Sequence, residues 1–402
     1  MRRQVAALAL AAATAAAVAA GCGEEESAAP RGDTAKQASG KPLVLANITD
    51  ESFPGADWTV FRKAGEAAAQ YINEELGGFG GRPIEIRTCD PKLNPAATTA
   101  CANKAIEEDA FAEYGLAVSW GQAGLPVFEK ADRVAFDVPT DDVEFSNPAS
   151  FPLVGGSTAH PGMAKYICQQ HPKSIVYLVN DLPSVRKYMD ATAEVYAGCG
   201  VKMTPIYTNP QAVDITPDVA KAVKLKPDYF SMVYGNKQMV IVYKALQQAG
   251  IPGDRIIGPG AAGDTKQFFD LAGDSAEGTL MSFSFASWSD ESNADVKLYH
   301  EVMEKYDGGN PNGMLTQGAF SAVMTSYLAA KAIGFDKFNA ETLAAYLRET
   351  PEVPVFMGRP MANPAPNPEF PSVRQPYIRI VQWQNGKLVD KVTDNDGWFD
   401  PF

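Results

Sequence analysis

The chain has 402 residues, 46% of them hydrophobic, with 48 acidic against 35 basic side chains and a formal net charge of −13. Such an acidic chain is a poor partner for nucleic acid or for a broad anionic membrane surface. Beyond the first forty or so residues, the remaining chain of about 360 is too long for one typical core, so we expect two domains.

The first 21 residues have the pattern of a secretory signal. Two arginines precede an alanine-rich run over residues 5–20, about 16 residues against the roughly 20 that span a bilayer. Cys22 follows and resembles the cysteine of a bacterial lipobox, although Ala19 stands where a larger aliphatic residue is usual. We therefore expect residues 1–21 to be removed and Cys22 to be lipidated. The alternatives are ordinary secretory cleavage, which leaves Cys22 free, and a retained apolar anchor.

Residues 22–41 contain almost no large apolar side chain. Because they cannot bury a core, we expect them to form a flexible tether. Globular sequence begins at residue 42, and no later segment has the pattern of a membrane span.

The first part of the globular sequence alternates between strand and helix patterns, with Gly77-Gly78 ending the first helix. Such βαβ repetition predicts a parallel sheet covered on both faces. The predicted strands are residues 43–49, 83–88, 116–119 and 134–138, and the helices between them are residues 61–76, 95–108 and 122–131.

The alternation then begins again, which favours two wound sheets over one. Three helices, an extended proline-rich segment over residues 351–376 and a final hairpin follow, with Asn385-Gly386 as a favoured type I′ turn. The predicted strands of the second sheet are residues 174–180, 201–207, 229–234, 255–258 and 279–285, and the hairpin strands are 377–384 and 387–392. The predicted helices are residues 163–170, 185–196, 217–223, 237–249, 265–272, 293–306, 314–333 and 340–349.

Cysteine usage agrees with export. Apart from Cys22 there are four cysteines, an even number in a chain expected to enter an oxidising space. Of the three possible pairings we favour Cys89 with Cys101 and Cys168 with Cys199, because each pair lies within one predicted domain and closes a short loop. Free buried thiols are the alternative. No CxxC pair occurs, so we expect no metal.

One stretch of the sequence resembles a known family, the type I periplasmic binding proteins of the branched-chain amino-acid and amide group. Residues 64–90, AGEAAAQYINEELGGFGGRPIEIRTCD, are similar to that family's helix, Gly-Gly turn, basic residue and strand ending in Asp. Supporting pieces are residues 226–228 before a strand, Ala249-Gly250 at a helix end and residues 276–278 before another strand. The resemblance covers residues 42 to about 392.

The resemblance implies two Rossmann-like lobes with parallel sheets, joined by three crossovers, that close on a ligand about a hinge. We place the crossovers near residues 156–160, near 286–290 and within 353–376. The expected first lobe is then residues 42–158 plus 287–355, and the second is residues 159–286 plus 356–402.

General physics also locates a site, since ligands of doubly wound sheets bind outside the carboxyl ends of the strands. We expect Ser119, Trp120, Gly121 and Gln122 to be central, because a strand that runs through Gly into a helix offers backbone N–H groups to a carboxylate. In the family this loop holds the ligand's α-carboxylate. The alternative is that Ser119 only caps the helix and Trp120 packs in the lobe. Further candidates in such loops are Asp50, Asp141, Asn236, Asp264 and Phe283.

Asp264 follows Gly260-Ala261-Ala262-Gly263, where the family often supplies an acidic partner for the ligand's ammonium group. It is equally suited to cap the next helix. The chain departs from the family where Asp181-Leu182-Pro183 replaces a usual Tyr-Gly. An aromatic wall is therefore missing or comes from elsewhere. Because similar proteins bind amides and aromatic acids as well as amino acids, we expect the ligand to be one of these three.

An enzyme is the least favoured alternative. Residues 258–263 satisfy G-x-G-x-x-G between a strand and a helix, the dinucleotide fingerprint, but the next strand does not end in the acidic residue that would hold a ribose. We expect a non-enzymatic, monomeric receptor without a cofactor. It would bind a small solute outside the cytoplasm and serve the permease and ATPase subunits of an ABC importer, lipid-anchored to the outer face of the bacterial cytoplasmic membrane. A ligand-sensing domain of a signalling system is the second reading.

Overall fold

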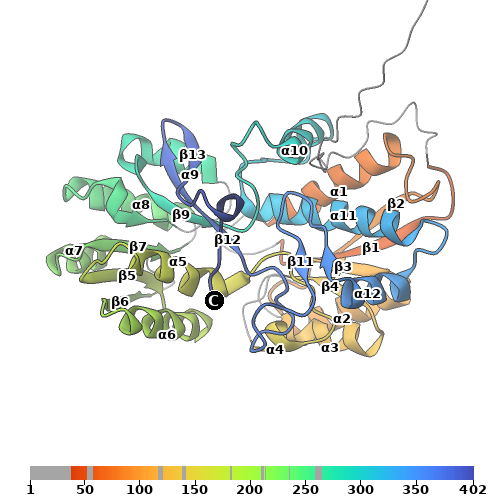
Figure 1. The fold of residues 1–402 in the computed structure, drawn as a ribbon, viewed down its shortest axis with the longest axis horizontal. Helices are drawn as coiled ribbons and strands as arrows, with labels where there is room; N and C mark the ends of the chain where they lie inside the picture. Colours follow the sequence, from red (N-terminus) through yellow and green to blue (C-terminus); the bar gives the residue numbers. More distant parts are fainter. Residues whose placement is uncertain are drawn as a thin grey trace, which may run out of the picture.

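The computed structural model describes residues 38–51, 58–115, 121–137, 142–181, 183–209, 212, 214–234, 236–258 and 265–402. These residues form two α/β lobes that lie side by side, the first on the right of Figure 1 and the second on the left. The expected signal sequence and Cys22 lie outside the described residues. None of the described helices is long and apolar enough to cross a bilayer.

The first lobe is built on a four-stranded parallel sheet in the order β2-β1-β3-β4. Successive side chains of the central strand β1 point to opposite faces. Leu43 and Leu45 pack with α1 and α11, and Ala46 and Ile48 pack with α2 and α3. Both faces of the sheet are therefore covered by helices. The elements are β1 (Leu43–Ile48), α1 (Thr59–Glu74), β2 (Ile84–Cys89), α2 (Pro95–Glu107), β3 (Ala112–Tyr114), α3 (Gly121–Lys130), β4 (Val134–Phe136), α4 (Asp142–Ser146), α10 (Ala294–Lys305), α11 (Met314–Ile333), α12 (Ala340–Glu349), β10 (Glu352–Val353) and β11 (Met361–Ala362).

The third strand of this sheet lies earlier than the sequence indicated. We expected it at residues 116–119, which fall outside the described residues, whereas β3 pairs with β1 and β4 at residues 112–114. The charged Glu113 made this segment look unlike a strand. In the structure Glu113 is fully buried, and its carboxylate accepts a hydrogen bond of 3.3 Å from the backbone N–H of Ile48.

The globular part also begins before residue 42. The backbone N–H groups of Ser39 and Gly40 donate to the carbonyl of Gly81, at 3.0 and 2.9 Å. Arg82 donates to the carbonyl of Lys41 at 3.1 Å. Residues 39–41 are thus attached to the first lobe, contrary to the predicted tether, because backbone hydrogen bonds need no apolar side chains.

The second lobe has an eight-stranded sheet in the order β13-β12-β9-β8-β7-β5-β6, with β14 also paired to β12. The strands from β6 to β9 are parallel, and β12 joins β9 antiparallel. Asn385 and Gly386 both have positive φ, 50° and 80°, which confirms the predicted hairpin turn. The elements are α5 (Ala159–Cys168), β5 (Ser174–Asn180), α6 (Pro183–Gly198), β6 (Lys202–Thr208), α7 (Thr216–Lys224), β7 (Tyr229–Val233), α8 (Asn236–Gln248), β8 (Ile256–Ile257), α9 (Thr265–Ala272), β9 (Leu280–Phe283), β12 (Ile378–Gln384), β13 (Lys387–Asp390) and β14 (Trp398–Phe399).

Both favoured disulfides are present. Cys89 at the end of β2 is bonded to Cys101 in α2, with Cα atoms 5.8 Å apart. Cys168 at the end of α5 is bonded to Cys199 just after α6, with Cα atoms 6.0 Å apart. Each bond lies within one lobe and ties a helix to its neighbour.

Three chain segments cross between the lobes next to one another. Gly155 of the first lies against Pro376 of the third, since a Cβ on this glycine would be 3.1 Å from the Pro376 carbonyl. The side-chain amide of Gln375 in the third donates to the Ser284 carbonyl in the second at 3.2 Å. This arrangement of two wound lobes and three adjacent crossings confirms the predicted fold class.

The third crossing occurs later than the expected boundary at residue 355. The backbone N–H of Ser372 donates to the backbone carbonyl of Phe145 in α4 at 3.0 Å. The Ser372 hydroxyl donates to the Asn147 carbonyl at 2.7 Å. Arg374 stacks on Phe151 at 4.4 Å. Contacts with the first lobe therefore continue to about residue 374, and the chain crosses at Gln375. A proline-rich segment gives no periodic pattern, so the sequence could not show which lobe it packs on.

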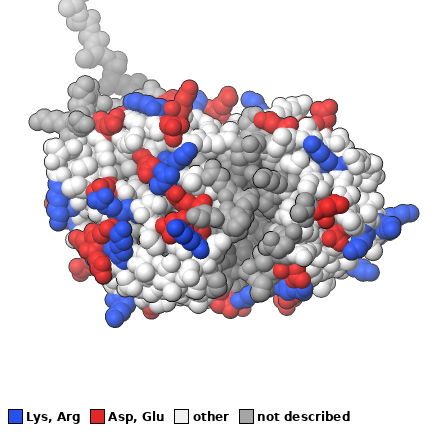
Figure 2. Space-filling model, turned by 180° about the vertical axis from the view of Figure 1, so that it is seen from behind, with Lys and Arg blue, Asp and Glu red and all other residues white. Residues whose placement is uncertain are grey.

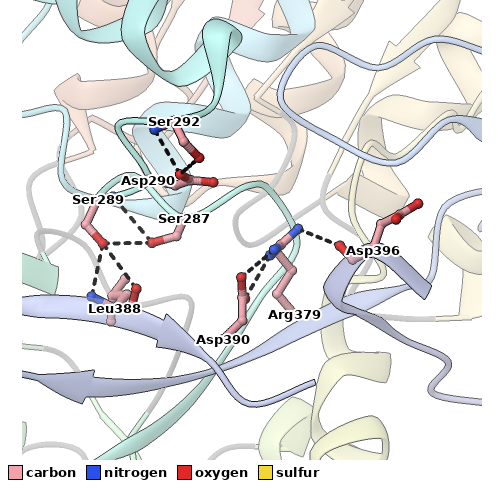
Figure 3. Close-up of polar contacts among 8 residues, drawn as sticks. All are labelled: Ser287, Ser289, Asp290, Ser292, Arg379, Leu388, Asp390 and Asp396. Atoms are coloured by element: carbon pink, nitrogen blue, oxygen red, sulfur yellow. Dashed lines mark hydrogen bonds and ion pairs between the residues drawn. The ribbon is translucent and has the colours of Figure 1, made fainter. Parts of the chain in front are cut away.

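The second crossing is tied to the last hairpin of the second lobe (Figure 3). The hydroxyl of Ser289 accepts a hydrogen bond from the backbone of Leu388 at 3.0 Å. On the neighbouring strand, Arg379 pairs with Asp390 through two nitrogens and donates to the Asp396 carbonyl at 3.2 Å. The crossing and the C-terminal segment are thus held to one sheet.

Candidate functional site

The first-lobe strands end in a connected set of polar groups. The Asn47 amide donates to the Thr49 hydroxyl at 3.1 Å and to the Tyr114 carbonyl at 3.0 Å. The Thr49 hydroxyl donates to the Gly115 carbonyl at 3.4 Å. Gly115 has φ +106°, and a Cβ there would be 2.4 Å from the Thr49 hydroxyl oxygen, so a glycine is needed. These bonds hold the carboxyl ends of β1 and β3 together.

Asp50, one of the predicted site residues, lies at this edge but is 3% exposed. Its carboxylate accepts a hydrogen bond of 2.6 Å from the backbone N–H of Leu93, in a turn where Lys92 and Leu93 both have positive φ. The next residue, Glu51, pairs with Arg62 of α1 at 2.8 Å. Asp50 therefore supports the turn that follows β2.

Two other predicted residues begin α3. Gly121 is buried at the first helical position and Gln122 is partly buried beside it, so the expected helix start after β3 is present. Asn236 is likewise the first residue of α8. The predicted residues Ser119, Trp120, Asp141 and Asp264 lie outside the described residues, as do residues 259–263 of the possible dinucleotide motif.

Phe283 and Phe285, two residues apart, are both fully buried in the same hydrophobic core. Phe283, which we predicted in the site, is fully buried in β9 opposite Arg379 and packs in the hydrophobic core. Phe285 lies beyond the end of β9, where the second crossing begins, and lines a pocket. Both are buried aromatic residues near one strand end, so the sequence offered no signal to choose between them.

That pocket, which we call the α11 pocket, opens where β3 and β4 end. The empty space inside it and at its mouth is about 420 Å³, a figure that includes open solvent. The wall combines α1, the ends of two strands, two crossing segments and the N-terminal turns of α11. The described lining residues are Phe61, Tyr114, Gly115, Phe136, Asp137, Leu153, Val154, Phe285, Met314, Leu315, Gly318, Ala319 and Ala322.

Two polar groups interrupt this apolar lining. Asp137 is 2% exposed, and the Ser150 hydroxyl lies 2.9 Å from its Oδ1. Tyr114 is 1% exposed, and its hydroxyl has no hydrogen-bond partner among the described residues. Burial raises the pKa of the Tyr114 hydroxyl well above its usual value, and the nearby carboxylates of Glu66 and Glu113 act in the same direction. Tyr114 therefore stays neutral at physiological pH.

The second lobe presents its own polar groups at the carboxyl ends of its parallel strands. The side-chain amide nitrogen of Asn180, which ends β5, donates to the side-chain oxygen of Gln238 in the first turn of α8 at 3.4 Å. The side-chain oxygen of Asn180 has no hydrogen-bond partner in the part of the chain that the structure describes. The Thr208 hydroxyl, at the end of β6, lies 3.2 Å from the hydroxyl of Tyr234. Asn180 and Tyr234 lie at or just beyond the ends of β5 and β7, where ligands of doubly wound sheets bind. Gln238 carries no sequence signal, since it is one polar residue in a helix.

On the face that Figure 2 shows, Lys and Arg are interspersed with Asp and Glu among the described residues of both lobes. Among the described residues, no three His, Cys, Asp or Glu side chains are placed to hold a metal ion. The groups that converge at the strand ends are hydrogen-bonding and apolar. The α/β lobes that carry these groups have the type I periplasmic-binding-protein fold.

Comparison with known proteins gives the family. The sequence model of the periplasmic binding proteins matches residues 42–387, so the chain belongs to the periplasmic binding protein family. A search of curated proteins gave no match.

Solved structures agree on the fold. A leucine binding protein, LivK, from Thermotoga maritima has a TM-score of 0.69 at 17% identity, over 89% of this chain and 99% of that one. The isoleucine complex of the LivJ substrate binding protein from Streptococcus pneumoniae has a TM-score of 0.68 at 17% identity, over 87% and 98%. An R. palustris solute binding protein in complex with benzoate gives 0.69 at 17% identity, over 89% and 96%. At these identities the likeness is one of fold.

Proposed function

We propose that this protein is the extracytoplasmic solute-binding subunit of an ABC importer and binds an amino-acid-like or small carboxylate or amide ligand between its lobes. The observation that carries the proposal is the pair of wound sheets whose carboxyl ends bear polar groups, with three crossings side by side between them. Strand ends of this kind bind ligands, and adjacent crossings can act as a hinge.

The ligand class follows from site chemistry and from structural neighbours. Similar structures contain isoleucine or benzoate, and a fatty-acid ABC transporter substrate-binding protein from Thermomonospora curvata has a TM-score of 0.71 at 16% identity. These ligands share a carboxylate with an apolar body. In this chain the N-terminus of α3, beginning at Gly121 and Gln122, supplies N–H donors for a carboxylate, and Asp264 supplies an acidic partner for an ammonium group.

The remaining parts of the proposal concern location and partners. Lipidation of Cys22 would hold the mature protein at the outer face of the bacterial cytoplasmic membrane, as a monomer beside its permease and ATPase subunits. The segment that follows Cys22 would connect the membrane anchor to the first lobe, and the two lobes would bind the solute. Adjacent genes for two permeases and two ATPases would support transport, whereas a neighbouring signalling receptor would favour the sensor alternative.

A thermal-shift screen tests the ligand class directly. Amino acids, amides, polyamines and aromatic acids are each added to the purified protein, and a ligand that binds only the folded state raises Tm with the logarithm of its concentration. We expect a rise with an amino acid or small carboxylate. Trp120→Ala and Asp264→Asn should each weaken that ligand about 10-fold or more, while Asp274→Asn, at an exposed position in the same lobe, serves as the control. Full affinity in both site variants would remove these two residues from the site.

A further inference from the structure

The α11 pocket has one wall made by a single face of a helix. Leu315, Gly318 and Ala322 are spaced three and four residues apart, so they lie in one row along α11. Leu315 and Gly318 are partly exposed, whereas the helix is otherwise mostly buried at this end. The row therefore borders the open part of the pocket.

Because Gly318 has no side chain, it leaves open space in this row, next to the ring of Phe285. A Cβ built on it would lie 3.6 Å from the ring of Phe285, an ordinary van der Waals distance, and no other described atom is closer. A methyl group therefore fits without strain, whereas a longer side chain would extend along Phe285 into the pocket. The packing of α11 does not require a glycine here, and in a helix interior a glycine is less stable than alanine.

The polarity of the lining indicates which part of a solute fits. Apart from Asp137 and the Tyr114 hydroxyl the described lining is apolar, and none of the described lining residues is basic. A ligand carboxylate placed here would be desolvated without a cationic partner, which is costly. An apolar group instead gains about fourfold in affinity for each methylene that is buried.

We propose that the α11 pocket receives the apolar end of the solute, and that Gly318 sets the largest end that is accepted. The occupant is a short branched aliphatic group or a single ring, with the polar head directed toward the strand ends. This inference rests on the proposed function, because it names the part of the same solute that enters this pocket.

Calorimetric titration of two ligand series tests the proposal. L-Alanine, L-valine, L-leucine and L-phenylalanine share one head group, and benzoate and 3-phenylpropanoate supply an aromatic series without an ammonium group. The variants are Gly318→Ala and Gly318→Leu, with circular dichroism to check the fold. Gly198→Ala is the matched control, because a Cβ at this exposed glycine in α6 meets no atom within 4 Å.

In the wild type we expect affinity within a series to rise with the size of the apolar end, up to the size that fills the pocket. Gly318→Leu should raise the Kd of the tightest-binding large ligand about 10-fold or more, since overfilled packing is strongly unfavourable. The Kd of the smallest ligand that binds should stay within about threefold of its wild-type value. Gly318→Ala should raise Tm without ligand and still weaken the larger ligands. Gly198→Ala should leave every affinity unchanged.

Two results would overturn the inference. If Gly318→Leu weakened small and large ligands equally, or neither, the apolar end would not occupy this pocket, while the proposed function would stand. If none of the probes bound the wild type in either series, the proposed ligand class and this inference would fail together.

Discussion

Gly65 shows how one residue can decide whether a helix packs on its sheet. It lies in α1 against the ring of Tyr114 in β3, and a Cβ there would be 1.8 Å from the Tyr114 hydroxyl oxygen. Alanine is the better helix former, so propensity alone predicts that Gly65→Ala would stabilise the protein. The contact predicts the opposite, because the ring or the helix must move.

We therefore expect Gly65→Ala to lower the free energy of unfolding by about 1–3 kcal/mol, the usual cost of an overpacked core. Gly198→Ala, where the added methyl meets nothing, should raise it by about 0.5–1 kcal/mol. Urea unfolding of the two variants measures both effects. If Gly65→Ala and Gly198→Ala changed the free energy of unfolding equally, the predicted clash with Tyr114 would have no effect on stability.

His160 gives the protein a pH dependence at the level of one side chain. Its ring stacks on Tyr188 with centroids 4.6 Å apart, at the start of α5. Burial of the imidazole lowers its pKa to about 4, against an ordinary value near 6.5 in the unfolded chain. Between these two values the unfolded chain binds a proton that the folded chain does not bind.

Stability from this group is therefore present above about pH 6.5 and is lost as the pH falls toward about 4. At about 1.4 kcal/mol per pKa unit, the loss is at most about 3.5 kcal/mol. Chemical denaturation should show that the free energy of unfolding falls less steeply between pH 7 and 4 for His160→Phe than for the wild type. Tyr188→Phe, which keeps both the ring and the histidine, should retain the wild-type slope. Parallel curves for the wild type and His160→Phe would refute this assignment.

At the scale of elements, each lobe joins neighbouring helices or strands by a disulfide. Cys89–Cys101 closes a separation of 12 residues and Cys168–Cys199 one of 31. In the chain-entropy picture, the longer loop restricts the unfolded chain more. Each bond joins two elements of the same lobe, so we expect both to affect stability rather than the opening of the lobes.

Replacing both cysteines of a pair by serine should cost about 3 kcal/mol for the first bond and roughly 4 kcal/mol for the second. Unfolding curves in oxidising buffer give the two values, and the wild type in reducing buffer should lose the sum of them. A reduced wild type as stable as the oxidised protein would mean that neither bond stabilises the fold.

The crossings connect the element scale to the whole molecule. The side-chain amide of Gln317 in α11 donates to the Ala286 carbonyl at 2.9 Å, and the Ala286 N–H donates to the Met357 carbonyl at 2.7 Å. The second crossing is therefore attached to the same helix that lines the α11 pocket. A group that fills this pocket would press on Phe285, only one residue away from Ala286.

A ligand that contacts both lobes favours closure by its higher affinity for the closed form. We expect a saturating concentration of a ligand found in the screen to lower the radius of gyration in small-angle scattering. The same ligand added to Asp264→Asn at the same concentration should produce a smaller fall. If the radius of gyration did not change in the wild type, the protein would bind its solute without hinge closure.

Local patterns in the sequence determined much of the fold. The alternation of strand and helix, the Asn385-Gly386 turn and the cysteine spacing each act over a few turns of chain, so the two sheets, the hairpin and both disulfides were predictable. Backbone hydrogen bonding and side-chain periodicity set these features without reference to distant residues.

The tertiary structure alone decided which side chains meet. Glu113 is buried in β3, where the backbone N–H of distant Ile48 donates to its carboxylate. Ser372 and Arg374 attach the third crossing to the first lobe through Phe145 and Phe151. The α11 pocket brings Phe61, Phe285 and Gly318 together from three separate parts of the chain. Contacts between residues so far apart in sequence leave no periodic signal, because packing in three dimensions chooses them.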